Sequence, residues 1–239
     1  MTGPLRMDDS HPIADRYDVE RTEAVPLDEA AYTAVLNSDF QHHYADGRDI
    51  WTGEEAMRRA PRLLMSALGG QADAHVLDLG TGRGLDAAIL LDGGHRVTGI
   101  DLVAAPEWEA ITRQRPGRVR FLATAVLDLP GTAAYDAALD NGCFHHQHPD
   151  AYGSYLRRIH GLLRPDGLYT LSVFHAAGGI GGLYTNEGNR LYREFTEDEL
   201  NELIGAHGFT PVETHRVPRA IAGLTYLVGT FRRTGEDGR

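Results

Sequence analysis

The stretch VLDLGTGRG, which runs from Val76 to Gly84, places an apolar strand directly before a glycine-rich turn and a helix. Glycines at such a turn let the backbone bend tightly and approach a ligand, and the helix offers free N–H groups at its first turn. Asp101 ends the next apolar segment, VTGID. A carboxylate about 20 residues beyond the glycines can accept hydrogen bonds from both hydroxyls of a ribose. The stretch therefore predicts a site for a ligand that contains a nucleoside.

The residues around the glycines distinguish between two classes of ligand. A dinucleotide-binding motif requires a glycine where this chain has Leu85. A pyrophosphate would also meet two acids, Asp78 before the turn and Asp86 after it, whereas a ligand with an ammonium or sulfonium group gains from a nearby carboxylate. This pattern favours S-adenosylmethionine over NAD, and an NAD(P)-dependent oxidoreductase is the alternative.

Outward from this turn, strand and helix patterns alternate along the chain. Strands are expected at 75–79, 96–100, 118–122, 135–140 and 168–174, with helices at 84–91, 106–113 and 150–163 between them. Such alternation indicates a parallel sheet with helices on both faces. A T-x-x-E capping box at Thr196 and Glu199 predicts a last helix, and segments 209–215 and 221–231 predict an antiparallel pair at the sheet edge.

The segment before this core has a different pattern. Residues 27–40 have helical spacing, and a second helix is expected from Thr52, where Thr52 and Glu55 form another capping box. Residues 1–25 are polar and are predicted to be a flexible arm. The chain is therefore divided into an N-terminal arm and helical cap at 1–72 and a core at 73–239. The expected fold is α/β, a doubly wound, seven-stranded, mostly parallel sheet.

Composition excludes several classes of function. The 239 residues include no lysine, so all 23 basic side chains are arginine, and this rules out Schiff-base, pyridoxal phosphate and P-loop chemistry. The net charge of −11 disfavours nucleic acids and anionic membranes as partners. A single cysteine, Cys143, excludes a disulfide framework, and the acidic N-terminus without an apolar stretch predicts a cytoplasmic protein.

The segment from 76 to 231 resembles the class I S-adenosylmethionine-dependent methyltransferases in its DLGTGRG loop, in Asp101, and in the words FLATAVLDLP and YDAALDNGCFHH. The resemblance implies a Rossmann-like methyltransferase fold and S-adenosylmethionine as the cofactor. It implies that the methionine part lies at Asp78, Gly80, Thr81, Gly82 and Gly84, the ribose at Asp101 beside Leu102, the adenine at Ala125 and Val126, and the transferred methyl group near Asn141. The family often has an acid at the position of Ala125, which leaves Asp128 as an alternative contact for the adenine.

Two shorter sequence segments resemble one branch of that family. YADGRDIW, at 44–51, and LDNGCFHH, at 139–146, are similar to segments of the thiopurine, thiol, halide and tellurite methyltransferases. In that branch an N-terminal aromatic segment folds over the cofactor. The resemblance therefore implies that Tyr44 and Trp51 contact the cofactor.

Histidines gather near the expected ligand crevice. His145, His146 and His175 follow the fourth and fifth expected strands, so one of them could act as a general base, or all three could simply pack, cap helices or face solvent. A metal site from His145, His146 and His148 is disfavoured, because adjacent histidines rarely point at one ion. Cys143 is interpreted as a small buried residue, and the glycine-rich segment 175–190 as either a mobile lid or a linker.

These observations predict an S-adenosylmethionine-dependent methyltransferase that acts on a small molecule with a thiol, hydroxyl or amine. Positioning and exclusion of water would supply most of the catalysis. The alternatives are the NAD(P)-dependent oxidoreductase, a non-catalytic S-adenosylmethionine-binding protein, and a nucleic-acid or protein methyltransferase. No metal is expected, and the chain is expected to work without nucleic acid or membrane, with a homodimer as one oligomeric state.

Overall fold

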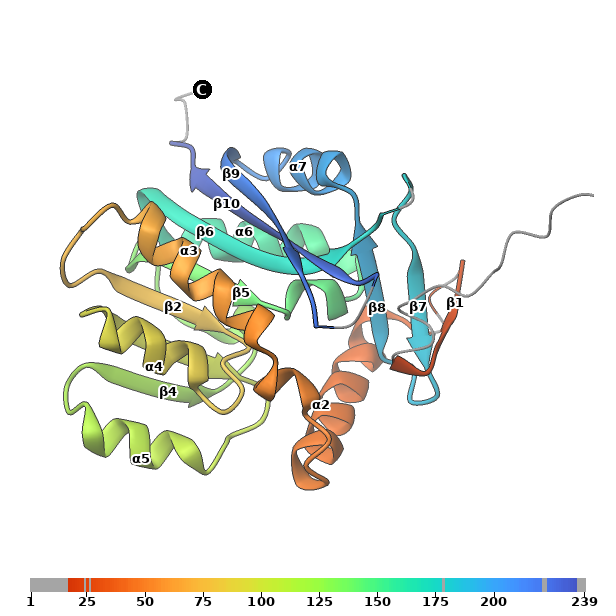
Figure 1. Cartoon of the computed structure of the whole chain (residues 1–239), viewed down its shortest axis with the longest axis horizontal. Helices are drawn as coiled ribbons and strands as arrows, with labels where there is room; N and C mark the ends of the chain where they lie inside the picture. The colour runs from red at the N-terminus through yellow and green to blue at the C-terminus, as the bar shows by residue number, and fades with distance from the viewer. Residues whose placement is uncertain (1–16, 24, 26, 178, 221–222, 236–239) are drawn as a thin grey trace, which may run out of the picture.

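The computed structural model describes residues 17–23, 25, 27–177, 179–220 and 223–235. Within these residues, ten strands form one sheet (Figure 1). The strands are β1 (Val19–Arg21), β2 (His75–Leu79), β3 (Arg96–Asp101), β4 (Val119–Ala123), β5 (Tyr135–Asn141), β6 (Leu163–His175), β7 (Leu183–Asn186), β8 (Leu191–Phe195), β9 (Phe209–Pro218) and β10 (Thr225–Arg233).

The centre of the sheet is parallel and its far edge is antiparallel. Strands β6, β5, β2, β3 and β4 lie side by side in that order and run parallel. Strand β10 then pairs antiparallel with β6, and β9 pairs antiparallel with β10. This order confirms the predicted α/β Rossmann-like class, including the antiparallel pair at the end of the chain.

Helices cover both faces of this sheet (Figure 1). One apolar cluster joins α3 (Arg59–Ala67) and α4 (Leu85–Asp92) to one face through Leu64, Leu90 and Val76, with Ile111 of α5 (Glu107–Gln114) packed against it. The opposite cluster joins α6 (Tyr152–Leu162) and α7 (Glu197–Gly205) to the other face. Because both faces are covered, the central strands read as nearly continuous apolar runs.

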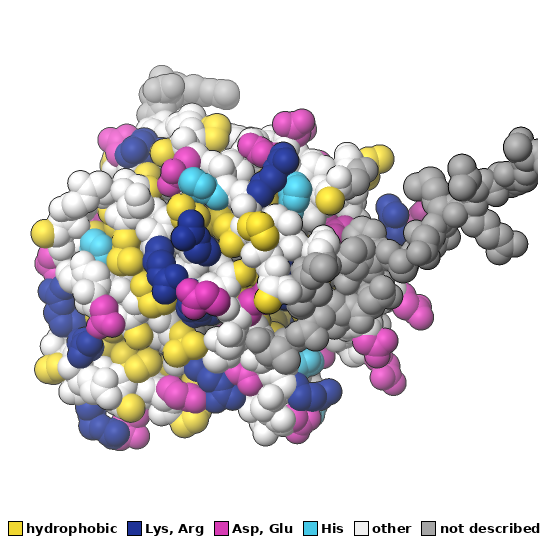
Figure 2. Space-filling model, viewed as in Figure 1, with side chains coloured by type: hydrophobic (Ala, Val, Ile, Leu, Met, Phe, Trp, Pro, Cys, Tyr) yellow, Lys and Arg dark blue, Asp and Glu magenta, His cyan; other side chains and the backbone are white. Residues whose placement is uncertain are grey.

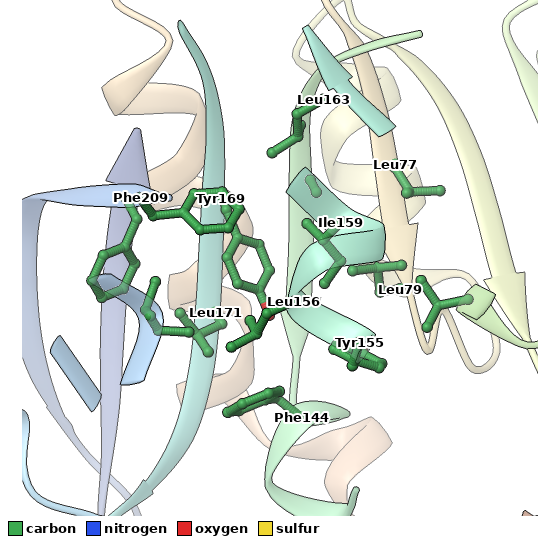
Figure 3. Close-up of a cluster of buried hydrophobic side chains, with 14 of the residues drawn as sticks. Leu77, Leu79, Phe144, Tyr155, Leu156, Ile159, Leu163, Tyr169, Leu171 and Phe209 are labelled. Carbon is green, nitrogen blue, oxygen red and sulfur yellow. The ribbon is translucent and has the colours of Figure 1, made fainter. Parts of the chain in front are cut away.

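Figure 3 shows the cluster under α6. Ile159 of that helix lies on the side of Leu79 of β2, and Leu156 lies on the side of Leu171 of β6. Leu77 also comes from β2, Tyr169 from β6 and Phe209 from β9. Every one of these side chains is at most 2% exposed. The cluster fixes the carboxyl ends of β2 and β5 relative to each other, which is where the ligand crevice of such a sheet lies.

The sheet has more strands than expected. Seven were predicted, but β1, β7 and β8 extend the sheet beyond β6. Strand β1 forms within the expected flexible arm, because Val19 to Arg21 pair with β7. Strands β7 and β8 form an antiparallel hairpin within the segment 175–190 and just after it, so that segment is not simply a linker. Parts of three predictions lie outside the described residues. These are residues 1–16 and 24 of the arm, residue 178 of the segment 175–190, and residues 221 and 222 of the last predicted strand.

The N-terminal helices also differ from the prediction. Helix α2 spans Glu29–Ala45 and so extends five residues beyond the expected helical segment at 27–40. The predicted capping box at Thr52 does not form, because the Thr52 hydroxyl donates to Asp49 Oδ2 (2.7 Å) and two short 3₁₀ turns precede α3. The box at Thr196 and Glu199 forms as predicted at the start of α7.

The division of the chain at residue 72 is not tested by these observations and stays a prediction. The two sides are joined by hydrogen bonds, since Tyr32 Oη of α2 donates to the carbonyl of His146 (2.6 Å) and accepts from the amide of Leu191 (2.9 Å). Among the helices of the described residues, none has the length and apolar character needed to cross a bilayer.

Candidate active site

A cavity opens at the carboxyl ends of β2, β3 and β5. The glycine loop after β2 forms one end of it, and side chains from α2, the segment after β5 and the β8 region form the other. Most of the predicted cofactor residues line it, namely Tyr44, Trp51, Gly80, Thr81, Gly82, Asp101, Leu102, Ala125, Val126 and Asn141. His145 and His146 also line it, whereas Asp78, Gly84 and His175 are not part of its lining.

The glycine loop turns in the way that its residues predict. Gly80, Gly82 and Gly84 all have positive φ, at 65°, 54° and 83°. A Cβ on Gly82 would lie 3.0 Å from Tyr44 Oη, so the loop and α2 approach closely here. A Cβ on Gly84 would lie 2.7 Å from Ile111 Cδ1, so this glycine permits helix α5 to pack rather than facing the cavity. Two glycines of the motif thus face the cavity, and the third serves packing.

Asp101 holds the loop from the neighbouring strand. Its Oδ2 accepts a hydrogen bond from the amide of Gly82 (2.9 Å), and its Oδ1 accepts one from the amide of Val103 (3.0 Å). Burial raises the pKa of its carboxyl above the usual value. The indole of Trp108 donates to the Gly82 carbonyl (2.7 Å). The N–H and the C=O of Gly82 are therefore both held by side chains, those of Asp101 and Trp108.

Asp78 does not line the cavity, although the family resemblance implies that it contacts the methionine part. Asp78 lies under the loop, where it accepts a hydrogen bond from the Thr81 hydroxyl, and burial raises the pKa of its carboxyl well above the usual value. Asp86, on the first turn of α4, lines the cavity instead. Of the two acids that flank the turn, Asp86 is therefore the one that lines the cavity.

A hydrogen-bonded group surrounds Asp86. Arg58 forms an ion pair with Asp86 Oδ1, and Asn141 Nδ2 donates to Asp86 Oδ2 (2.6 Å) and to the carbonyl of Met57 (2.8 Å). Asn141 Oδ1 is buried and has no hydrogen-bond partner among the described residues. Arg58 was not predicted as a site residue, because in the sequence it is only a basic residue within the helical pattern before the core.

The end of the cavity beyond Asp101 is apolar. Leu102, Ala125, Val126 and Leu127 line it, while the alternative contact Asp128 is exposed and lies outside the lining. Cys143 lines the same end, and burial raises the pKa of its thiol well above the usual value. This agrees with the interpretation of Cys143 as a small packing residue and not a nucleophile.

Arg83 ties the loop to the segment after α2. Its Nε donates to Asp49 Oδ2 (2.6 Å) and its Nη1 donates to Glu107 Oε1 (2.6 Å). Its guanidinium also lies over the ring of Tyr44, 5.7 Å from the centroid. These contacts hold Tyr44 and Trp51 at the cavity, on the same side as the glycines.

The other end of the cavity is an aromatic chamber. Its rings contact one another in a continuous chain, with centroids 5.9 Å apart for Phe40 and Trp51, 5.8 Å for Phe40 and His146, and 4.8 Å for His146 and Tyr192. We define this aromatic chamber by its cavity-lining rings, which are Tyr17, Tyr32, Phe40, Trp51, His145, His146, Phe174, Tyr192 and Tyr226. Such a lining favours a flat, apolar ligand that presents polar groups at its edge.

The histidines of the chamber are buried and neutral. His145 stacks on Phe174 with centroids 3.9 Å apart, and burial, with help from Arg219, lowers its pKa to about 3. His146 Nδ1 bonds the carbonyl of Leu191 (2.6 Å), and burial lowers its pKa well below the usual value. Imidazoles with such pKa values are poor general bases at neutral pH.

The remaining histidines serve the fold. His175 pairs with Phe195 where β6 meets β8 and is not part of the cavity lining. His148 Nε2 bonds the carbonyl of Leu27 (2.9 Å), and its Nδ1 accepts from the amide of Asp150 (3.1 Å). Both ring nitrogens of His148 are thus occupied, and the described residues contain no group of three or more His, Cys, Asp or Glu placed to hold a metal ion.

Comparison with known proteins identifies the family. The model of the methyltransferase domain family matches residues 52–214. The chain is similar to the Burkholderia thailandensis 1,6-didemethyltoxoflavin-N1-methyltransferase, whose crystal structure contains 1,6-didemethyltoxoflavin and S-adenosylhomocysteine. The two chains are 55% identical, the match covers 91% of this chain and 95% of the other, and the TM-score is 0.88.

More distant structures share the fold. The cyclase SpnF is 21% identical over 74% of this chain and 80% of its own, with a TM-score of 0.60. The N-methyltransferase NodS from Bradyrhizobium japonicum WM9 is 18% identical over 74% of this chain and 95% of its own, with a TM-score of 0.57. No curated protein sequence matches the chain. The family model matches most of the core, and a structure with 55% sequence identity covers 91% of the chain. The chain therefore belongs to the methyltransferase domain family and is an S-adenosylmethionine-dependent methyltransferase.

Proposed function

We propose that this enzyme transfers the methyl group of S-adenosylmethionine to a ring nitrogen of a flat heterocycle of the 1,6-didemethyltoxoflavin kind, which has polar groups at its edge. The observation that carries the proposal is the aromatic chamber, which opens into the same cavity as the glycine loop. Stacked rings bind flat heterocycles well, since each ring contributes a large contact area at a low cost in conformational entropy. The 55% identical relative, which holds such a heterocycle, supports the same assignment.

The residues at the glycine-loop end fit S-adenosylmethionine. The turn at Gly80 and Gly82 lets the backbone approach a ligand, the carboxylate of Asp101 suits the ribose, and the apolar side chains of Leu102 and Val126 suit the adenine. Asn141 Oδ1 offers an unpaired acceptor for the ammonium group of the methionine part, beside the Asp86 carboxylate that Arg58 pairs. When bound, the cofactor supplies a methyl group on a cationic sulfur.

The chain's own residues act by positioning and by excluding water. Tyr44 and Trp51 lie between the glycine loop and the chamber, where their ring faces attract a cationic centre. The rings of the chamber hold the methyl acceptor in one plane, so that one edge of it faces the cofactor end. An acceptor packed against these rings also displaces water, which would otherwise compete for its polar groups.

The test is methylation of 1,6-didemethyltoxoflavin by the purified chain with S-adenosylmethionine, followed by mass spectrometry. We expect a product that is heavier by one methyl substitution, and site mapping by NMR that places it on nitrogen. The Phe40→Ala variant, which removes a ring of the chamber, should raise KM for the heterocycle while S-adenosylhomocysteine still binds. Binding of S-adenosylhomocysteine without methylation of any flat heterocycle would contradict the proposal.

A second candidate acceptor is a thiol. Segments 44–51 and 139–146, which resemble the thiopurine, thiol, halide and tellurite methyltransferases, support it. A thiol also ionises readily and needs little help from a base. Assaying thiopurines and simple thiols beside the heterocycle separates the two candidates. A larger kcat/KM for the thiols would favour the branch over the heterocycle assignment.

We also propose that the chain acts in the cytoplasm without nucleic acid, as a homodimer. Acidic and basic side chains are interspersed on the face shown in Figure 2, and the net charge is −11. A nucleic-acid site instead needs basic side chains gathered along one path. Light scattering of the purified chain tests the dimer, and an RNA titration at low salt tests the absence of nucleic-acid binding.

A further inference from the structure

Arg190 stands out in the aromatic chamber, because it is a charged side chain that is only 2% exposed and yet lines the cavity. Its guanidinium lies over three rings of the chamber, at 4.8 Å from the centroid of Phe40, 4.8 Å from Tyr192 and 5.7 Å from Trp51. The Nε atom donates to Tyr192 Oη (3.0 Å). These contacts fix the guanidinium plane, so the charge is held in one place.

The counter-charge of Arg190 lies outside the chamber. Arg190 Nη1 forms an ion pair with Asp39 Oδ2 (2.6 Å), and Asp39 belongs to α2 but not to the cavity lining. A ligand in the chamber therefore meets the guanidinium and not the carboxylate. A second guanidinium, that of Arg219, lies behind the rings of Tyr226 (4.6 Å) and Phe174 (5.9 Å), where it is paired with Glu54.

The described part of the chamber holds no group suited to take a proton from the methyl acceptor. His145 and His146 are neutral and have pKa values far below neutrality. Among the carboxylates that line the cavity, Asp86 is paired with Arg58, Asp101 accepts two backbone amides at the other end, and Glu29 is exposed at the rim. The tyrosines of the chamber keep their protons, because burial raises the pKa of Tyr17, Tyr32, Tyr192 and Tyr226.

We propose that the chamber selects its methyl acceptor as the conjugate base of an acidic ring N–H, with the delocalised anion facing Arg190. This inference rests on the proposed function, because it specifies the ionisation state in which that acceptor binds. The ring proton leaves to water before binding. The nitrogen lone pair then forms the N–C bond to the methyl group while the S–C bond breaks, and its electron pair stays on sulfur in S-adenosylhomocysteine.

The charged and titratable groups that face Arg190 are consistent with this role. From α2 these are Tyr32 and Asp39, and from the segment after β5 they are His145 and His146. From the opposite side Tyr192 accepts its hydrogen bonds. Burial is the main cause of the lowered pKa of both histidines, and the Arg190 charge lowers the pKa of each one further, so the field of this guanidinium repels added positive charge and attracts negative charge.

The first experiment measures kcat/KM against pH for two flat heterocycles, one whose ring N–H titrates near neutrality and one whose N–H titrates well above it. We expect kcat/KM to rise about tenfold per pH unit up to the N–H pKa of each compound and then to stay level. A general base on the enzyme would instead give a profile that falls above the N–H pKa, because the protonated acceptor disappears. A fall of that kind, or a rise at the same pH for both compounds, overturns the inference.

The second experiment removes the charge and measures binding, not turnover. With S-adenosylhomocysteine present and the pH above the N–H pKa, calorimetry compares the heterocycle anion with its uncharged N-methylated counterpart. The double variant Asp39→Asn, Arg190→Gln should lose about tenfold or more of the preference for the anion, and Arg190→Lys should keep most of it. An unchanged preference in the double variant overturns the inference.

These experiments separate this inference from the proposed function. If the unmodified chain binds S-adenosylhomocysteine but methylates no flat heterocycle, the proposed function fails. If it methylates the heterocycle with a profile that falls above the N–H pKa, only the anion inference fails. If the double variant does not fold, the pH profiles of the unmodified chain and the comparison with Arg190→Lys still decide the outcome.

Discussion

A single substitution can test whether Asp101 binds the ribose of the cofactor. Its two oxygens accept separate backbone amides, from Gly82 and Val103, so the carboxylate is held in place before any ligand arrives. We expect Asp101→Ala to weaken binding of S-adenosylhomocysteine by about 1–3 kcal/mol, the loss expected for a buried hydrogen-bonding carboxylate. Calorimetric titration measures this change.

Asp128→Ala is the matched control for that experiment. Asp128 lies in the adjacent segment but is exposed and outside the cavity lining. Its loss should leave the affinity unchanged, and an equal loss in both variants would mean that general charge, and not the position of Asp101, attracts the ligand. Thermal unfolding without ligand shows whether Asp101→Ala has also loosened the glycine loop.

His145 predicts how stability depends on pH. Its pKa is about 3 in the folded chain, against about 6.5 in an unfolded chain. The unfolded state therefore takes up a proton first as the pH falls below 6.5. The free energy of unfolding should then decrease by up to about 1.4 kcal/mol per pH unit, until the pH approaches 3.

Other buried groups also titrate in this range, so the contribution of His145 is measured by comparing the unmodified chain with a variant that lacks this imidazole. Urea unfolding of the unmodified chain and of His145→Gln between pH 7 and about pH 4.5 gives two curves. The unmodified chain should lose stability faster on acidification than the variant does. Parallel curves would show that His145 takes up its proton in the folded state and is not held neutral.

The residues that local sequence predicts well are those whose function depends on neighbours in the chain. Gly80, Gly82 and Asp101 follow strands directly, so their position at the crevice follows from the strand pattern alone. Arg190 could not be assigned, because its burial depends on Asp39 and on rings of Phe40 and Trp51, which are far from it in the sequence. Asp78 and Asp86 flank the same turn, and only the three-dimensional path of the loop shows which of them reaches the cavity.

At the scale of elements, β3 approaches the glycine loop so closely that one of its positions must be glycine. A Cβ on Gly99 would lie 2.6 Å from Phe121 Cδ1 and 2.9 Å from Thr81 Oγ1. Phe121 cannot retreat easily, because it stacks on Trp108 with centroids 5.1 Å apart. We expect Gly99→Ala to lower the free energy of unfolding by about 1–3 kcal/mol, as overpacking does.

Gly161 in α6 is the matched control. A Cβ there would meet no atom within 4 Å, and alanine favours a helix over glycine by about 0.5–1 kcal/mol. Gly161→Ala should therefore raise the free energy of unfolding, and urea titration compares both variants with the unmodified chain. Destabilisation of similar size in the two variants would contradict the argument from close approach.

The elements themselves were predictable to different degrees. The strands of the parallel centre are runs of apolar residues between turns, and the structure confirms them within a few residues. The hairpin of β7 and β8 was not predicted, because Arg190, Arg193 and Glu194 make its sequence look exposed. Thr196 and Thr52 carry the same capping pattern, but only Thr196 forms a box, since the hydroxyl of Thr52 bonds Asp49 instead.

At the scale of the whole molecule, the cavity joins parts of the chain that are remote in sequence. Tyr17, Trp51, Asp101 and Tyr226 all line it. A ligand that binds the folded chain alone should therefore stabilise all of these parts together. At a concentration 100 times its Kd, S-adenosylhomocysteine should add about 2.7 kcal/mol to the free energy of unfolding.

Differential scanning fluorimetry at several ligand concentrations measures this effect. The Tm should rise with the logarithm of the concentration, and a single cooperative transition should persist. NADH at the same concentrations is the control, because the loop has Leu85 where a dinucleotide motif needs glycine. An equal rise with NADH would show that the cavity does not distinguish the two ligands.

The pairing of β1 with β7 has a consequence for synthesis of the protein. Val19 to Arg21 are synthesised long before their partners at Tyr184 to Asn186, because more than 160 residues lie between the two segments. Pairing between such distant segments is slow, and a nascent chain exposes its unpaired strand in the meantime. Tyr17, which contacts Phe174 and Tyr192, reaches its place by the same late step. An unfinished polypeptide therefore cannot build this wall of the cavity, and ribosome-bound chains that stop before residue 184 should carry no methyl-transfer activity.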